Sequence, residues 1–161
     1  LMSDHTWVEV RIRKSDELAL IEHLGEYSYV EDETDTSMLV SYEEYGGGAF
    51  DELEELAALN IPFISYCGAG GGFGPTITVS IGDGRAVEIE VGMGGGYVVH
   101  MGPDGLVTRE SVDYVEMVER LREEASRAIT AGDVPIVEEE KPIVQTPPKN
   151  INLRFQGRKA S

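Results

Sequence analysis

Hydrophobic and polar residues follow two different periods at the start of the chain. Residues 8–13 alternate between apolar and charged side chains, and this period of two is typical of a strand with one buried face. Over residues 15–25 the apolar side chains recur every three or four positions, which predicts a helix that ends at a glycine. The apolar positions behind these two predictions are Val8, Val10, Ile12, Leu18, Ile21 and Leu24.

The same periods predict four more elements over the next 40 residues or so. Strands are expected over 27–30 and 38–43, joined by an acidic loop over 31–37. A helix follows over 50–59, and a further strand over 61–67. The resulting order β-α-β-β-α-β predicts an α+β fold, specifically a ferredoxin-like sandwich.

The second half of the chain extends this sandwich. Residues 77–81 and 87–91 alternate on either side of Gly82-Asp83-Gly84, a pattern that predicts a β-hairpin. A further strand is expected over 97–101, and a long amphipathic helix over 111–131.

The composition changes after the long helix, where prolines become frequent. We therefore expect a single α+β domain over 1–132 and a flexible, proline-containing tail over 133–161. Near the end of this tail, Ile151, Leu153 and Phe155 alternate beside basic residues. Three interpretations of that segment remain open: a peptide that docks on a partner or on the acidic body, a frayed terminus, or the remnant of a protease tag.

Acidic residues dominate the charge of the protein. The chain has 30 Asp and Glu against 13 Lys and Arg, a net charge of −17. The first 60 residues hold 16 acids and three bases, whereas residues 61–132 hold ten and five. This potential repels phosphate backbones and anionic lipids, so we expect neither direct nucleic-acid binding nor membrane binding. It favours a basic protein surface, and the expected partner is a nucleic-acid-binding host protein.

The candidate partner-binding residues are the acids of the first 60 residues that flank the predicted strands and the second helix, together with two tyrosines. Tyrosine buries much area at small entropic cost in an interface, although core packing is the alternative for both rings. The predicted contact residues are Glu31, Asp32, Glu33, Asp35, Tyr42, Glu43, Glu44, Tyr45, Asp51, Glu52 and Glu55.

The single cysteine, Cys67, excludes an internal disulfide and any multi-cysteine metal site. It favours a reducing compartment, so we expect a cytoplasmic protein. An alternative function is a small cysteine-dependent enzyme in which His100 acts as the base for Cys67. A buried structural thiol is the competing interpretation of the same residue.

Glycine runs and acidic runs offer two further kinds of site. The glycines at 46–48, 68–74 and 92–96 lack the spacing of a phosphate-binding loop, so turns or adaptable surfaces are expected there. Residues 31–35 supply oxygens for a hard cation but lack the glycine of a calcium loop, which favours a solvated loop. We expect no cofactor and no metal.

Two segments carry a resemblance to known proteins. Residues 45–59, followed by Ile61-Pro62-Phe63 and by the glycine-rich run to Pro75, resemble segments of small, uncharacterised proteins of phages and plasmids. The resemblance implies an accessory role in a mobile element, and small acidic proteins of that kind are often anti-CRISPR or anti-restriction inhibitors. It carries over no catalytic residue.

Three hypotheses for function follow. The first is a non-enzymatic inhibitor whose acidic face occupies the basic surface of a host defence protein, in the host cytoplasm if the protein is phage-encoded. The second is the cysteine-dependent enzyme. The third is a domain whose acidity serves only solubility. A homodimer through the last helix or an edge strand remains possible in each case.

Overall fold

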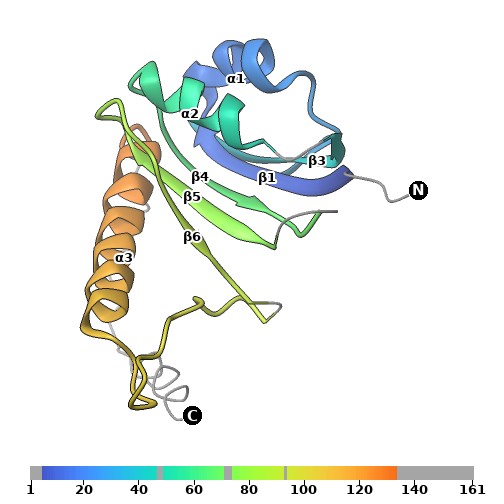
Figure 1. Ribbon diagram of the computed structural model, residues 1–161. Coiled ribbons are helices and arrows are strands. Elements are labelled where there is room, and N and C mark those ends of the chain that lie inside the picture. Colours follow the sequence, from blue (N-terminus) through green and yellow to red (C-terminus); the bar gives the residue numbers. More distant parts are fainter. Residues whose placement is uncertain (1–4, 47–48, 71–73, 93, 134–161) are drawn as a thin grey trace, which may run out of the picture.

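A computed structural model describes residues 5–46, 49–70, 74–92 and 94–133 of the chain (Figure 1). It contains one six-stranded antiparallel sheet and three α-helices, which confirms the predicted α+β class. The elements are β1 (His5–Arg13), the 3-10 turn η1 (Lys14–Asp16), α1 (Glu17–Leu24), β2 (Tyr29–Glu33), β3 (Ser37–Gly46), α2 (Phe50–Ala58), β4 (Pro62–Cys67), β5 (Thr76–Ile81), β6 (Val87–Glu90) and α3 (Arg109–Ile129).

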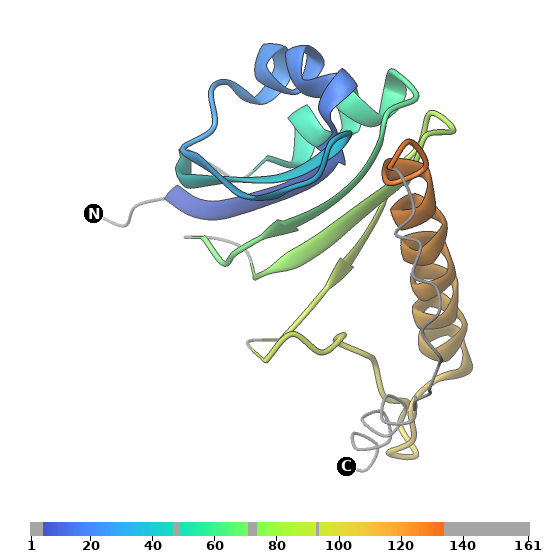
Figure 2. The same ribbon diagram turned by 180° about the vertical axis from the view of Figure 1, so that it is seen from behind.

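The strands lie in the order β2-β3-β1-β4-β5-β6, and every neighbouring pair is antiparallel. Helices α1 and α2 pack together on one face of the sheet, whereas α3 packs on β4 and β5 from the other face (Figures 1 and 2). The sheet is therefore the middle of three layers. Its two edges are β2 and β6.

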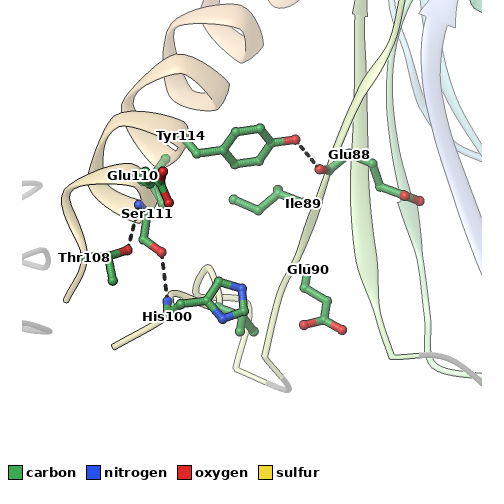
Figure 3. Close-up of a pocket in the computed structure, with 10 residues that line it drawn as sticks. Glu88, Ile89, Glu90, His100, Thr108, Glu110, Ser111 and Tyr114 are labelled. Atoms are coloured by element: carbon green, nitrogen blue, oxygen red, sulfur yellow. Dashed lines mark hydrogen bonds between the residues drawn. The ribbon is translucent and has the colours of Figure 1, made fainter. Parts of the chain in front are cut away.

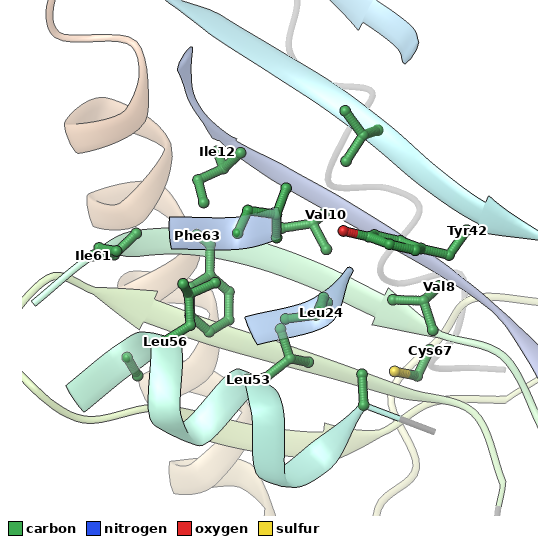
Figure 4. Close-up of a cluster of buried hydrophobic side chains, with 14 of the residues drawn as sticks. Val8, Val10, Ile12, Leu24, Tyr42, Leu53, Leu56, Ile61, Phe63 and Cys67 are labelled. Atoms are coloured by element: carbon green, nitrogen blue, oxygen red, sulfur yellow. The ribbon is translucent and has the colours of Figure 1, made fainter. Parts of the chain in front are cut away.

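The first core lies between the sheet and the pair α1 and α2. Alternation along β1 turns Val10 and Ile12 to this face, where Ile12 is the register partner of both Met38 and Phe63. Phe63 is fully buried against the apolar side of α2 (Figure 4). This core contains Val8, Val10, Ile12, Leu20, Leu24, Met38, Val40, Tyr42, Leu53, Leu56, Ile61, Phe63 and Cys67.

A second core lies between α3 and the other face of the sheet. Ile77 and Val79 of β5 pack there with Val118 and Ala125 of α3. Strand β4 serves both cores, since Phe63 faces α2 while its neighbour Ile64 packs against the second cluster. Successive residues of a strand therefore face opposite helix layers, and each layer packs against every second side chain.

The predicted loop over 31–37 is wrong at its start. Strand β2 continues to Glu33, and the chain reverses only at residues 35 and 36, where Thr34 donates its N–H to the carbonyl of Ser37 at 2.8 Å. Acidic residues are disfavoured in strands on average. At a solvated edge their side chains stay in water, while β3 supplies backbone partners along one side.

The predicted strand over 97–101 is also wrong. Only isolated bridges occur there, between Val91 and Tyr97 and between Met101 and Val107. The backbone of His100 bonds to the α3 side instead, donating its N–H to Ser111 Oγ at 2.9 Å and accepting from Thr108 N at 3.0 Å. These local bonds replace a strand ladder. The hairpin and the helices predicted over 15–25, 50–59 and 111–131 are confirmed to within a few residues.

The described chain ends in a hydrogen-bonded contact. The Asp133 carboxylate accepts hydrogen bonds from the hydroxyl of Thr36, from that of Thr34 at 2.7 Å and from that of Ser37 at 3.5 Å. The end of α3 is thereby tied to the β2–β3 turn. The rest of the predicted tail, including the alternating segment 151–155, lies outside the described residues.

Candidate binding surface

Strand β2 forms an open edge of the sheet. It pairs with β3 on one side, with a register shift between Val30 and Asp32, and no described strand pairs with its other side. All five of its residues are exposed. Three of them, Glu31, Asp32 and Glu33, are consecutive acids, so the unpaired backbone of this edge is bordered by carboxylates.

The nine predicted acidic contact residues fall into two groups. One group follows the β2–β3 hairpin and the other lies on α2. Nitrogen-bearing side chains approach both groups: Lys14 Nζ is 3.5 Å from Glu33 Oε1, and His23 Nδ1 is 3.2 Å from Glu55 Oε1. Eight are exposed and one, Glu52, is half-buried; the set is Glu31, Asp32, Glu33, Asp35, Glu43, Glu44, Asp51, Glu52 and Glu55.

The two predicted tyrosines differ in position. Tyr42 is 4% exposed and donates its hydroxyl to the carbonyl of Gly25 at 2.9 Å, so its ring belongs to the first core. Tyr45 is half-buried and lies edge-on to Tyr42, with centroids 5.5 Å apart. Burial, together with the charges of Glu52 and Glu55, raises the pKa of Tyr45 to about 12. The acids of α2 therefore lie close to the end of β3.

A second aromatic pair lies on the sheet face opposite α1 and α2. The Trp7 and Tyr29 rings meet edge-on with centroids 6.1 Å apart. Ser41 is the register partner of both Tyr29 and Glu9, and it is fully buried. Its small side chain leaves space for the two rings to meet across β3.

Carboxylates are held around this aromatic pair. Trp7 Nε1 donates to Glu9 Oε2 at 2.9 Å, and Ser41 Oγ donates to Glu31 Oε2 at 2.7 Å. Burial, and then the charges of Glu43 and Glu31, raise the pKa of Tyr29 above its usual value. We name these residues (Trp7, Glu9, Tyr29, Glu31 and Ser41) the aromatic–acidic cluster.

The candidate contact residues predicted from sequence omit most of this cluster. Trp7 and Glu9 stand on the polar side of the β1 alternation, which was a usable signal that they share a face. The contact between Trp7 and Tyr29 depends on β3 lying between β1 and β2. Strand order is not encoded in local periodicity.

Cys67 and His100 lie in different layers. Cys67 is 1% exposed among the apolar residues beneath α2, and burial raises the pKa of its thiol to about 11 (Figure 4). At neutral pH it is therefore a protonated, enclosed thiol. His100 is exposed and lines a groove beside α3. No hydrogen bond joins these two described side chains, and the arrangement supplies no nucleophile–base pair.

The groove beside α3 has a volume of about 560 Å³ and lies between β6, the 98–108 segment and the first turns of α3 (Figure 3). Tyr114 Oη closes one side by donating to the carbonyl of Glu88 at 2.5 Å. The carboxylate of Glu88 extends away from α3 (Figure 3). The groove therefore has a mixed lining, in which Ile89, Val98 and Val115 are apolar and His100, Glu90 and Glu110 are ionisable.

The described ranges lack two further kinds of feature, a metal-binding cluster and a membrane-spanning helix. No group of three or more His, Cys, Asp or Glu side chains there is arranged to hold a metal ion. None of the helices in those ranges has the length and apolar character needed to cross a membrane. The glycine runs are described only in part, because residues 47–48, 71–73 and 93 lie outside the described chain.

Comparisons of the chain with protein-family models, with curated proteins and with solved structures gave no match. No residue role is therefore transferred from a relative.

Proposed function

We propose that this protein is a non-enzymatic binding protein that occupies a basic, nucleic-acid-binding surface on another protein. The observation that carries the proposal is the β2 edge, where all five residues are exposed and three consecutive ones are acidic. The acids of β3 and α2 extend the same negative surface, and Tyr45 lies where the two groups approach each other.

The spacing of these charges supports mimicry of a nucleic-acid strand. Successive residues of a strand rise by about 3.3 Å. Measured along the helix axis, one strand of B-DNA carries one phosphate per about 3.4 Å. Glu31, Asp32 and Glu33 therefore place three carboxylates along the edge at a similar linear density, with successive side chains on opposite faces of the sheet. The Arg and Lys side chains that bind phosphates also bind carboxylates.

The scaffold that we propose for this surface is ferredoxin-like over β1 to β4. Two observations support it: the strand order β2-β3-β1-β4, and the placement of α1 and α2 on one face. Strands β5 and β6 and helix α3 are then additions to this unit.

We propose further that the protein inhibits a host defence system on behalf of a phage or plasmid, in the host cytoplasm. The support is the resemblance of residues 45–59 and of the segment to Pro75, together with the net charge of −17. Defence nucleases expose basic grooves to DNA or RNA, and an acidic surface can compete for such grooves.

The test is competition between this protein and nucleic acid. A fluorescent duplex is bound to a restriction endonuclease, or guide RNA to a Cas9-type effector, and the acidic protein is titrated in at 50, 150 and 400 mM salt. We expect displacement from at least one such protein, with the apparent affinity falling at least tenfold between the lowest and highest salt.

Two matched variants test whether the competition depends on the acids of the β2–β3 hairpin. E31Q/D32N/E43Q removes three charges from the hairpin, and E116Q/E123Q/E124Q removes three from exposed positions on α3. The first should weaken competition and the second should leave it near wild type. Equal loss in both, or no competition across the panel, would mean that the acidity is a general property of the surface rather than a binding site.

A further inference from the structure

The sheet face beside β2 carries an aromatic pair, which a surface that binds by charge alone would not need. Trp7 and Tyr29 place two rings together next to the polar residues Glu9 and Ser41, which are register partners, and Tyr29 is 41% exposed. Helix α3, which covers the other half of this face, packs on β4 and β5. The rings therefore lie beside α3 rather than beneath it.

The carboxylates around the rings are fixed in position. Glu9 is held by the Trp7 indole N–H, and Glu31 by the Ser41 hydroxyl. A cation placed over the face of a Trp or Tyr ring is attracted by its quadrupole, and neighbouring carboxylates add a direct charge interaction. Aromatic rings next to ordered carboxylates are therefore suited to the side chain of Arg or Lys.

A strand that pairs with the neighbouring β2 edge would present such an Arg or Lys side chain to the cluster. A strand added outside β2 would pair with the backbone of Tyr29–Glu33 and would place every second side chain on the Tyr29 face. Side chains on that strand would lie next to Tyr29 at its exposed side. The edge and the aromatic–acidic cluster are thus parts of one surface.

A second copy of this chain is a poor occupant of the edge. Antiparallel pairing of two β2 strands would bring the acids at 31–33 of one copy against those of the other, and like charges opposite each other are destabilising. Arg11 lies two residues beyond Glu9 on the same face, and Lys14 lies beside Glu33, so positive charges of the chain bound the site at these two points. Charge complementarity therefore selects a basic segment from a different protein.

We propose that the β2 edge binds an extended basic segment of a partner protein as an added strand, and that the aromatic–acidic cluster receives one of its Arg or Lys side chains. This inference rests on the proposed function and specifies the form in which the basic partner is bound. The partner contributes a flexible or edge segment in which Arg or Lys recurs at every second position.

Binding at the cluster can be followed by the fluorescence of Trp7, because it is the only tryptophan in the chain. The probe is a ten-residue peptide in which Arg and Thr alternate, titrated at 50 mM salt while Trp7 emission is recorded. We expect a saturable change in emission. A peptide with Glu in place of Arg should give none.

Two comparisons test the strand and the cluster separately. Two N-methylated peptides, one methylated at every Thr and the other at every Arg, retain every charge. Because alternate residues of a strand direct their N–H groups to opposite sides, one of the two loses the N–H groups that pair with the edge, and its affinity should fall at least fivefold. The substitution Tyr29→Leu retains an apolar side chain but removes the π face, and it should weaken binding about two- to fivefold. Circular dichroism checks that the variant is folded, and calorimetry confirms the affinities independently of Trp7.

The control variant is Glu116→Gln on α3, which should bind the peptide within twofold of wild type. Wild-type affinity for both N-methylated peptides would overturn strand addition, and unchanged affinity in Tyr29→Leu would overturn the role of the cluster. If either result occurs while the protein still displaces nucleic acid from a defence protein, only the inference fails. Loss of that displacement, by contrast, removes the proposed function itself.

Discussion

The two edges of the sheet are protected in different ways. At β6, the carbonyl of Glu88 accepts from Tyr114 Oη at 2.5 Å, and the carbonyl of Glu90 accepts from Val98 N at 3.0 Å. The Tyr114 side chain and the backbone of Val98 thus occupy two carbonyls of β6 that an incoming strand would need for pairing. At β2 no described strand covers the outer side, and acids border it instead.

Both arrangements oppose uncontrolled edge pairing, but only one is selective. A covered edge rejects every strand, because its backbone partners are already bonded. A charged edge rejects strands of like charge and remains open to those of opposite charge. The contrast shows that an exposed edge can serve as a recognition element when its charge excludes self-association.

The largest expected effect comes from removing the charge of the open edge. The variant E31Q/D32N/E33Q should self-associate through β2, with a dimer dissociation constant roughly tenfold or more below that of the wild type. Several like-charge contacts between paired strands are lost at once in this variant. Sedimentation velocity over a range of concentrations measures the shift.

The matched control for this variant is E116Q/E123Q/E124Q, which changes the net charge equally on α3. It should sediment as the wild type does. If both triple variants associate to the same degree, the loss of general repulsion explains the effect and the β2 edge has no special role.

A smaller effect is expected at the covered edge. Tyr114→Phe removes the hydrogen bond to the Glu88 carbonyl, so the free energy of unfolding should fall by about 0.5–1 kcal/mol. Urea unfolding measures this difference. The control is Tyr66→Phe, since the Tyr66 hydroxyl has no hydrogen bond to another described residue; a loss as large there would contradict the assignment.

The smallest effect concerns the contact that joins α3 to the open edge. Hydrogen bonds from Thr36 and Thr34 lower the pKa of Asp133 below its usual value of 3.8. The ionised carboxylate therefore stabilises the fold, fully above the unfolded value of about 3.9, and this contribution is lost as pH falls through the folded pKa.

Comparison of Asp133→Asn with the wild type between pH 2.5 and 6 isolates this contribution. The wild type should melt at a higher temperature above about pH 4, and the difference should shrink toward pH 2.5. Other carboxylates with lowered pKa values, such as Asp83, titrate in both proteins and cancel in the difference. A difference independent of pH would show that Asp133 acts through packing alone.

Local periodicity predicted most of the secondary structure. The alternation of β1, the β5–β6 hairpin and the three helices follow directly from side-chain spacing. The end of β2 was missed because its acids resemble a loop, and only pairing with β3 makes them strand residues. The strand expected over 97–101 failed because its backbone bonds to the α3 side instead.

The candidate surface was predicted in part. Sequence alone located the acids, because charged residues in short segments remain solvated in almost any fold. It assigned Tyr42 to the surface, whereas the structure buries it at 4% exposure, because alternation along β3 turns it to the helix face. The Trp7–Tyr29 pair needed the strand order, which arises from packing across the whole sheet.

The bonds from Asp133 to the β2–β3 turn fix the position of the last described residue. Asp133 lies at the corner of the molecule that also carries Asp35 and the end of β2. A fluorophore or fused domain attached just after this point would crowd the acidic hairpin. A tether on the solvent side of α3, at Glu123 for example, would leave that corner clear.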